Sequence, residues 1–138
     1  MSLAVRCIRP LMVISAGVFA GAAYAVRAVV DGPVEQYSGA AFSGAIVYTI
    51  VVFVRPPVSP LSAGGVAVGY CWFIEFSQLT PIPAAISQRS WFARQLLGAQ
   101  FDAVDVAWYP AGVVPLVAVH WFFRARTRPE PAPAEVQG

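Results

Sequence analysis

Two short stretches of an apolar sequence carry acidic, amide and phenolic side chains at helical spacing. Glu75 and Gln78 are three residues apart and so share one helix face. Asp105 and Tyr109 are four residues apart on another, with Asp102 just before them. An ionisable group inside a membrane span costs about 2.5 to 3.5 kcal/mol, so it needs a partner or a role. These five residues are the first candidates for chemistry in this chain.

Three arginines are expected at the same level as these carboxyl groups: Arg27 at the end of the first apolar segment, and Arg89 and Arg94 in the loop before the last one. Arginine binds phosphate or carboxylate bidentately, and carboxylates accept hydrogen bonds from hydroxyls and amines. Two interpretations stay open, a site for a polar or phosphorylated lipid headgroup and a salt-bridged cluster that only holds helices together. Both predict that Glu75, Asp105 and at least one of these arginines form a single cluster.

Several enzyme classes are excluded by the residue inventory. The chain has one His, two Cys and no Lys, so it lacks a Schiff-base lysine, a glycine-rich phosphate loop ending in Lys and the usual zinc ligand sets. Ser77 and His120 are expected at opposite ends of the membrane, too far apart for a nucleophile and its base. Asp102 and Asp105 could share acid–base work or a divalent ion with Glu75, but aspartates at a helix start more often complement the helix dipole. We expect no catalytic residue, metal or cofactor, which favours a protein that is not an enzyme.

The composition places the chain in a membrane. Hydrophobic residues make up 58% of its 138 residues and charged residues 12%, about half the charged fraction typical of soluble domains. The charges separate four apolar runs. Each run has close to the length of ~20 residues that a helix needs to cross a bilayer. We predict an all-α, polytopic membrane protein forming a single domain over residues 1–123, with transmembrane helices at 11–30, 38–54, 61–79 and 103–123.

The arginines predict the orientation. Arginines concentrate on the cytoplasmic side of membrane proteins, and six of the nine would lie on one side if both termini were cytoplasmic: Arg6, Arg9, Arg55, Arg124, Arg126 and Arg128. The proline-rich end at residues 124–138 is predicted to be a disordered cytoplasmic tail. Scattered arginines make no basic patch for nucleic acid, so nucleic acid is not an expected partner.

A signal peptide is the alternative to this topology. Ala23-Tyr24-Ala25 has the small-x-small form of a cleavage site and follows an apolar stretch with arginines before it. Cleavage would remove residues 1–25. We favour an intact first helix because the apolar run continues past this site to Val30.

The loop from Thr80 to Asp102 is long for a protein that otherwise uses tight turns, and long loops with some structure are often functional. Its middle predicts one short interfacial helix between the third and fourth spans. Ser90 is the expected N-cap and Gly98 the expected stop. Apolar and aromatic contacts come from Trp91, Phe92, Leu96 and Leu97.

Small residues at four-residue spacing predict close helix packing. Gly17 and Gly21, Gly65 and Gly69, and Ala40 and Gly44 have this spacing, which lets helix backbones approach in lipid. We expect them at seams within the bundle rather than at a dimer face. The oligomeric state is not predicted. Cys7 and Cys71 are expected at different depths, too far apart for a disulfide.

Several segments together resemble a family of small bacterial membrane proteins catalogued as a domain of unknown function. The resemblance covers about residues 10 to 120, and Glu-Phe-Ser-Gln-Leu at 75–79 is its most specific part. It is carried by Tyr37-Ser38-Gly39, Tyr48, Arg55-Pro56, Trp72 to Leu79, Arg89, Leu97-Gly98, Phe101, Asp105, Trp108-Tyr109 and Gly112.

The order Glu-x-x-Gln, Arg, Asp, Gly is also similar to VanZ-like membrane proteins, some of which confer teicoplanin resistance. Those proteins have a shorter loop after the Gln and commonly an Asn after the Asp, where this sequence has Tyr109. The resemblance implies a four-helix fold in a bacterial cell membrane and a cell-envelope setting, and it supplies no reaction.

We therefore expect a protein that binds a polar or phosphorylated envelope lipid at the outer leaflet. Its partner is a membrane lipid, and the binding residues are Glu75, Gln78, Arg89, Arg94, Asp102, Asp105, Tyr109 and Arg27. The alternative is a membrane scaffold or assembly protein whose polar cluster is structural.

Overall fold

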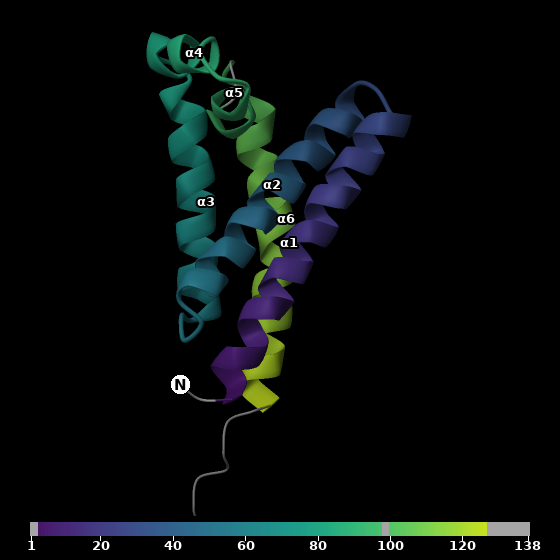
Figure 1. The fold of residues 1–138 in the computed structure, drawn as a ribbon, viewed down its shortest axis with the longest axis vertical. Coiled ribbons are helices and arrows are strands. Elements are labelled where there is room, and N and C mark those ends of the chain that lie inside the picture. Colours follow the sequence, from purple (N-terminus) through teal and green to yellow (C-terminus); the bar gives the residue numbers. More distant parts are fainter. Residues whose placement is uncertain (1–2, 98–99, 127–138) are drawn as a thin grey trace, which may run out of the picture.

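The computed structural model describes residues 3–97 and 100–126. Within these ranges the chain is helical and has no strand. Figure 1 labels the six helices, which are α1 (Leu3–Val29), α2 (Pro33–Val54), α3 (Pro60–Ser77), α4 (Pro81–Ser87), α5 (Trp91–Leu97) and α6 (Ala103–Arg126). The predicted all-α class is confirmed.

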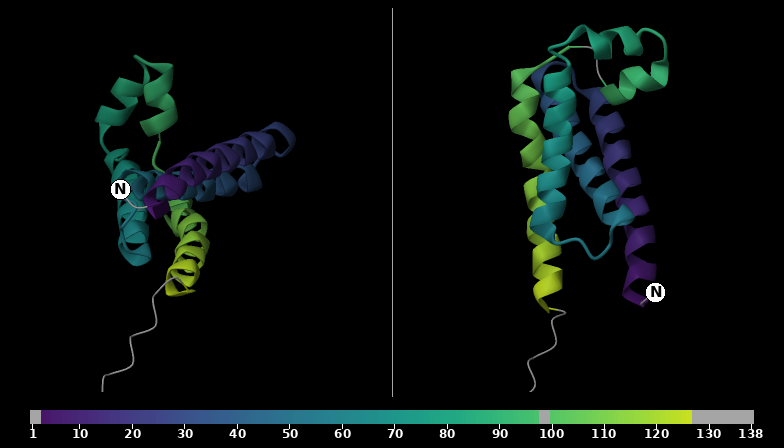
Figure 2. Two further views of the ribbon diagram at one scale, coloured as in Figure 1. Left: turned by 60° about the horizontal axis from the view of Figure 1, so that its bottom comes forward. Right: turned by 90° about the vertical axis from the view of Figure 1, so that its left-hand side faces the viewer.

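The four long helices run in alternating directions between two ends of an elongated bundle (Figure 1). We call the end with the start of α1, the α2–α3 turn and the end of α6 the terminal end. The opposite end, with the α1–α2 turn, α4 and α5, is the loop end. Helix α6 contacts both α2 and α3, and α1 packs on α2. Figure 2 shows α4 and α5 side by side at the loop end.

Three helices are long and apolar enough to cross a membrane. These stretches are Cys7–Val29, Pro33–Val54 and Ala103–Arg126, and they fit a multi-pass membrane protein. Helix α3 has 18 residues, a length of about 27 Å, but it is not among them. It contains the acidic residue Glu75 and three glycines. The sequence-predicted fourth span therefore stays a prediction.

Helix starts follow local rules of sequence. Ser59 caps α3 by accepting a hydrogen bond from the Ser62 N–H at 3.1 Å, and Pro60 occupies the first turn, where its missing N–H costs nothing. Helix α2 also begins with a proline, after Gly32, whose φ of 83° suits a residue without a Cβ.

The long loop contains two short helices where the sequence predicted one. Helix α5 begins directly after Ser90, whose hydroxyl accepts a hydrogen bond from the Ala93 N–H at 3.3 Å, as expected of an N-cap. The predicted stop at Gly98 lies outside the described residues. Sequence reasoning missed α4, although Thr80-Pro81 gives it the usual N-cap and first-turn proline.

The core lies in the terminal half, where α2, α3 and α6 meet. Its buried members are Tyr48, Val52, Ala63, Ala67 and Val113. Most are small or β-branched, so the helix backbones approach closely. Helix α6 continues to Arg126, three residues into the predicted tail, and residues 127–138 of that tail lie outside the described residues.

Two glycines allow a close crossing between α2 and α6. A Cβ on Gly112 would lie 1.8 Å from the Ala41 carbonyl oxygen, and one on Gly44 would lie 2.6 Å from that of Tyr109. The predicted seam at Ala40 and Gly44 is confirmed, since both are buried.

The other two predicted seams are wrong within the bundle. A Cβ on Gly17, Gly21, Gly65 or Gly69 would meet nothing within 4 Å. Spacing shows that two glycines share a face but does not show which face meets another helix.

Candidate functional site

Glu75 is the buried centre of the loop end. Its side chain comes from the last turn of α3, and the residue is only 2% exposed. Oε1 accepts a hydrogen bond from the Asp102 backbone N–H at 2.6 Å, and Oε2 accepts one from the Tyr109 hydroxyl at 2.9 Å. The carboxylate therefore ties α3 to the first two turns of α6 and to the residue before them.

Asp102 extends this network to α2. Its Oδ1 accepts a hydrogen bond from the Val104 N–H at 2.8 Å, which caps α6, and its Oδ2 accepts one from the Gln36 side-chain amide. Glu75, Asp102, Tyr109 and Gln36 thus join α2, α3 and α6 at one level. Three of the four are predicted site residues.

Gln78 links this cluster to α5. Its amide nitrogen donates to the Leu97 carbonyl at 2.6 Å, so the residue that ends α3 also holds the end of α5. Its amide oxygen is buried and has no hydrogen-bond partner among the described residues. The same holds for Oδ1 of Asp105, in the first turn of α6.

The predicted arginines lie outside this network. Arg27 pairs with Glu35 across the α1–α2 turn, with 3.3 Å between Nε and Oε1. Arg89, between α4 and α5, and Arg94, in α5, are exposed. Among the described residues no salt bridge joins an arginine to Glu75. Its partners are instead a backbone amide and a hydroxyl, which donate hydrogen bonds without adding charge.

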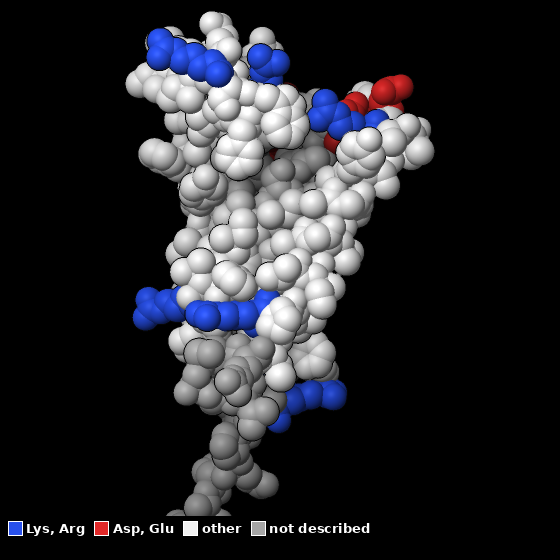
Figure 3. Space-filling view, in the orientation of Figure 1, with Lys and Arg blue, Asp and Glu red and all other residues white. Residues whose placement is uncertain are grey.

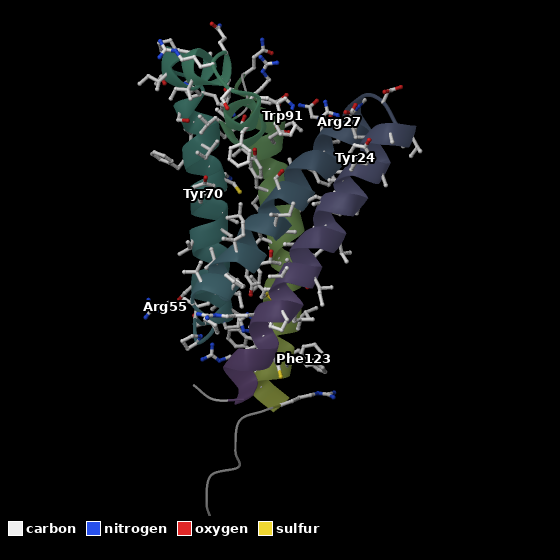
Figure 4. The ribbon with its side chains drawn as sticks, viewed as in Figure 1. Tyr24, Arg27, Arg55, Tyr70, Trp91 and Phe123 are labelled. Atoms are coloured by element: carbon white, nitrogen blue, oxygen red, sulfur yellow. The ribbon has the colours of Figure 1, made fainter. Side chains whose placement is uncertain are left out.

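The loop end combines exposed arginines with exposed aromatic rings. Trp91 is 71% exposed and Phe92 64%, and both lie between Arg89 and Arg94 in the chain. Figure 3 shows the acidic side chains gathered at this end, and Figure 4 shows Trp91 and Arg27 there from separate elements. This end therefore presents cations and apolar rings side by side.

Sequence reasoning missed two residues that help to position this site. Gln36 is polar but has no charge to mark it. Trp72 donates from Nε1 to the Val106 carbonyl at 2.9 Å. Pro110 lies four residues after Val106 and has no N–H, so this carbonyl lacks its helical partner. The position of Pro110 in the sequence could have indicated this contact, because the free Val106 carbonyl needs a hydrogen-bond donor from a neighbouring helix.

A second polar pair lies toward the terminal end. A hydrogen bond of 2.7 Å joins the Tyr48 hydroxyl of α2 to Nδ1 of His120 in α6. Both cysteines are free, as predicted, with Cys7 exposed and Cys71 buried. No three His, Cys, Asp or Glu side chains of the described residues are placed to hold a metal ion.

The arrangement limits what the site can do. Both Glu75 oxygens accept hydrogen bonds from protein donors, so this carboxylate acts as a positioning group. Gln78 and Asp105 offer acceptors, and Arg89 and Arg94 offer donors and positive charge. The two acceptors are buried, whereas both arginines are exposed.

Three apolar helices long enough to cross a bilayer, in a bundle with a buried polar network at one end, fit a multi-pass membrane protein. The model of a family of unknown function, DUF2809, matches residues 29–113, and the chain belongs to this family. The match covers every predicted site residue except Arg27. No curated protein and no solved structure matches the chain.

Proposed function

We propose that this protein binds a polar, phosphorylated envelope lipid at the loop end, with Arg89 and Arg94 contacting the phosphate. The main support for this proposal is that both arginines are exposed and lie next to the exposed Trp91 and Phe92 in the chain. Exposed aromatic rings are typical of the headgroup level of a bilayer, and arginine binds phosphate bidentately.

The buried acceptors support a headgroup that also carries hydroxyls or an amine. Asp105 and the amide oxygen of Gln78 would accept its hydrogen bonds, since an unpartnered buried acceptor costs about 1 to 3 kcal/mol. Glu75, Asp102 and Tyr109 hold α6 and the preceding segment in place for this contact.

The proposal includes a topology. Helix α3 is the fourth span, because its about 27 Å nearly matches the about 30 Å hydrocarbon core. Helices α4 and α5 lie along the outer interface of a bacterial cell membrane, and both termini are cytoplasmic. The arginine asymmetry supports this orientation.

The test is a census of lipids retained by the full chain after gentle extraction, measured by native mass spectrometry. Arg89→Gln with Arg94→Gln should leave the protein folded in the membrane and abolish co-purification of a specific phosphorylated lipid. Arg27→Gln is the matched control, since Arg27 is at the same end but pairs with Glu35. A wild-type protein that retains only bulk phospholipid in membrane proportions would refute the proposal.

A scaffold or assembly role is the second candidate, and it is favoured by the hydrogen bond that each Glu75 oxygen accepts from protein. A carboxylate with both oxygens bonded to other helices is what a purely structural cluster requires. In this case Glu75→Ala should prevent the protein from assembling with its partner, and no specific lipid should be found on the wild-type protein.

A further inference from the structure

An open groove lies between α1 and α2 in the terminal half of the bundle, away from the loop-end network. Its volume is about 190 Å³. Residues of both helices line it: Met12, Val13, Ala16, Thr49, Ile50 and Phe53. Thr49 is the one polar residue among them, and its hydroxyl donates to the Ile46 carbonyl at 2.7 Å. The groove therefore offers an occupant almost purely apolar contacts.

Arg9 lies at the end of this groove. It precedes Met12 and Val13 by one helical turn, on the same face of α1. Its guanidinium lies over the Phe53 ring, 5.6 Å from the ring centroid. An aromatic ring attracts a cation without neutralising it, and within residues 3–97 and 100–126 no salt bridge to Arg9 is present. The apolar groove therefore has a positive charge at its edge.

The surroundings of Arg9 add positive charge and no negative charge. Arg55 follows the end of α2, two residues after Phe53, and Figure 4 shows it toward the terminal end. The acidic residues of the described ranges belong instead to the α1–α2 turn, the start of α2, the end of α3 and the start of α6, all at the loop end (Figures 1 and 3). They are Asp31, Glu35, Glu75, Asp102 and Asp105. The edge of the groove at Arg9 therefore favours an anion.

In a membrane this groove would face lipid. Both of its helices are long and apolar enough to cross a bilayer, and two lining residues, Val13 and Ile50, are 59% and 51% exposed. Arg9 lies two residues after Cys7, where the apolar stretch of α1 begins, and arginines near the end of a span extend to the headgroups. The matching occupant has an apolar chain in the bilayer and an anionic group at its surface.

We propose that this groove binds part of an acyl chain of an anionic phospholipid from the leaflet at the terminal end, with Arg9 contacting the phosphodiester. Basic sites between membrane helices bind anionic headgroups, and a guanidinium presents paired N–H donors to phosphate. The volume is below the about 300 to 1,000 Å³ of pockets that enclose a drug-sized molecule, so the rest of the lipid stays in the bilayer. This site shares no residue with the loop-end site and does not depend on the function proposed above.

The test uses the full chain in a neutral detergent, with Arg89→Gln and Arg94→Gln in every sample so that the loop-end arginines do not contribute. Phosphatidylglycerol or phosphatidylcholine is titrated in, and bound lipid is counted by native mass spectrometry. This parent protein should bind phosphatidylglycerol more tightly than phosphatidylcholine. Adding Arg9→Gln should weaken phosphatidylglycerol binding about fivefold, whereas Arg9→Lys keeps the charge and should weaken it less than about twofold.

Arg126→Gln is the matched control for the charge. Arg126 also lies over an aromatic ring at the terminal end, 4.0 Å from the Phe122 centroid, but Phe122 does not line the groove. Its removal should change binding less than about twofold, because exposed charges at a distance are screened. A loss equal to that of Arg9→Gln would show that binding follows the total charge of this end, and would overturn the assignment to the groove.

A second pair of variants tests the groove itself and keeps every charge. Val13→Trp adds bulk at an exposed position that lines the groove, and Val18→Trp adds the same bulk at an exposed position of α1 outside it. Val13→Trp should weaken phosphatidylglycerol binding at least as much as Arg9→Gln, and Val18→Trp should leave it unchanged. Unchanged binding in either Arg9→Gln or Val13→Trp would overturn the proposal. So would equal binding of the two lipids, or displacement of phosphatidylglycerol by inorganic phosphate alone.

Discussion

The terminal half and the loop half of the bundle join the same three helices by different interactions. In the terminal half α2, α3 and α6 meet through small and β-branched side chains such as Ala63, Ala67 and Val113. In the loop half they are joined by hydrogen bonds around Glu75 and Asp102. The terminal half relies mainly on close contact, together with a hydrogen bond between Tyr48 and His120, and the loop half on several directed polar bonds.

This difference shows where a membrane bundle can contain buried polar groups without a large loss of stability. Lipid gives helices little hydrophobic reason to associate, so the terminal half depends on close packing. The loop half contains a buried carboxylate, which is acceptable because backbone and hydroxyl donors meet both of its oxygens. Its remaining buried acceptors, on Gln78 and Asp105, have no hydrogen-bond partner among the described residues.

The largest expected effect comes from Gly112→Ala at the α2–α6 crossing, which both halves share. Its Cβ would lie 1.8 Å from a backbone oxygen that cannot rotate away, so the helices must separate. We expect a loss of about 3 kcal/mol, seen as a lower melting temperature in detergent.

Gly65→Ala is the control for this change, because a Cβ there meets nothing within 4 Å. It should melt like the wild type or be more stable by up to about 1 kcal/mol. Equal melting of the two variants would show that the crossing does not depend on glycine.

Glu75→Ala should have the next largest effect and should loosen only the loop half. The change orphans the Asp102 N–H and the Tyr109 hydroxyl, at a cost of about 2 to 3 kcal/mol. Hydrogen exchange should rise at the start of α6 and stay low around Val52 and Val113. Glu75→Gln keeps one good acceptor, so its loss of stability should lie between those of the wild type and Glu75→Ala. Faster exchange in both halves alike would show that Glu75 stabilises the whole bundle and not the loop half alone.

Tyr109→Phe and Tyr48→Phe compare one hydrogen bond in each half. Tyr109 donates to a carboxylate, whereas Tyr48 bonds a histidine ring nitrogen. Charged acceptors make stronger hydrogen bonds, so we expect losses of about 1.7 kcal/mol for Tyr109→Phe and about 0.6 kcal/mol for Tyr48→Phe, within the range measured between membrane helices. Thermal unfolding of both variants in the same detergent tests the order, and a larger loss for Tyr48→Phe would reverse it.

Arg27→Gln should have the smallest effect. The Arg27 side chain is 71% exposed, and its salt bridge with Glu35 faces solvent or headgroups. Exposed ion pairs contribute about 0.2 to 1 kcal/mol, so the melting temperature should hardly change and the remaining contribution should vanish at high salt. A loss comparable to that of Glu75→Ala would mean that Arg27 belongs to the buried network.

Much of the fold could be predicted from residue types alone. Apolar runs separated by arginines and prolines gave the four long helices, three of which have the length and hydropathy of spans. Ser90 marked the start of α5. These features are local, because a helix start or an apolar run depends on neighbours in the chain.

The partners within the candidate site could not be predicted in the same way. The sequence placed Arg27 at the level of several carboxylates, and only the geometry of the α1–α2 turn selects Glu35. Glu75 bonds a backbone amide of Asp102, a donor that every residue except proline carries and that a search for charged side chains overlooks.

The sequence by itself determined that the chain is helical and apolar and that its acidic groups fall at a few helical positions. Tertiary structure decided which groups meet: Gly112 lies against Ala41, while Gly17, Gly21, Gly65 and Gly69 face no helix. The physical reason is that periodicity fixes the face on which a side chain lies, whereas contact depends on how each helix is rotated and crossed against its neighbour, and that is set by the packing of the whole bundle.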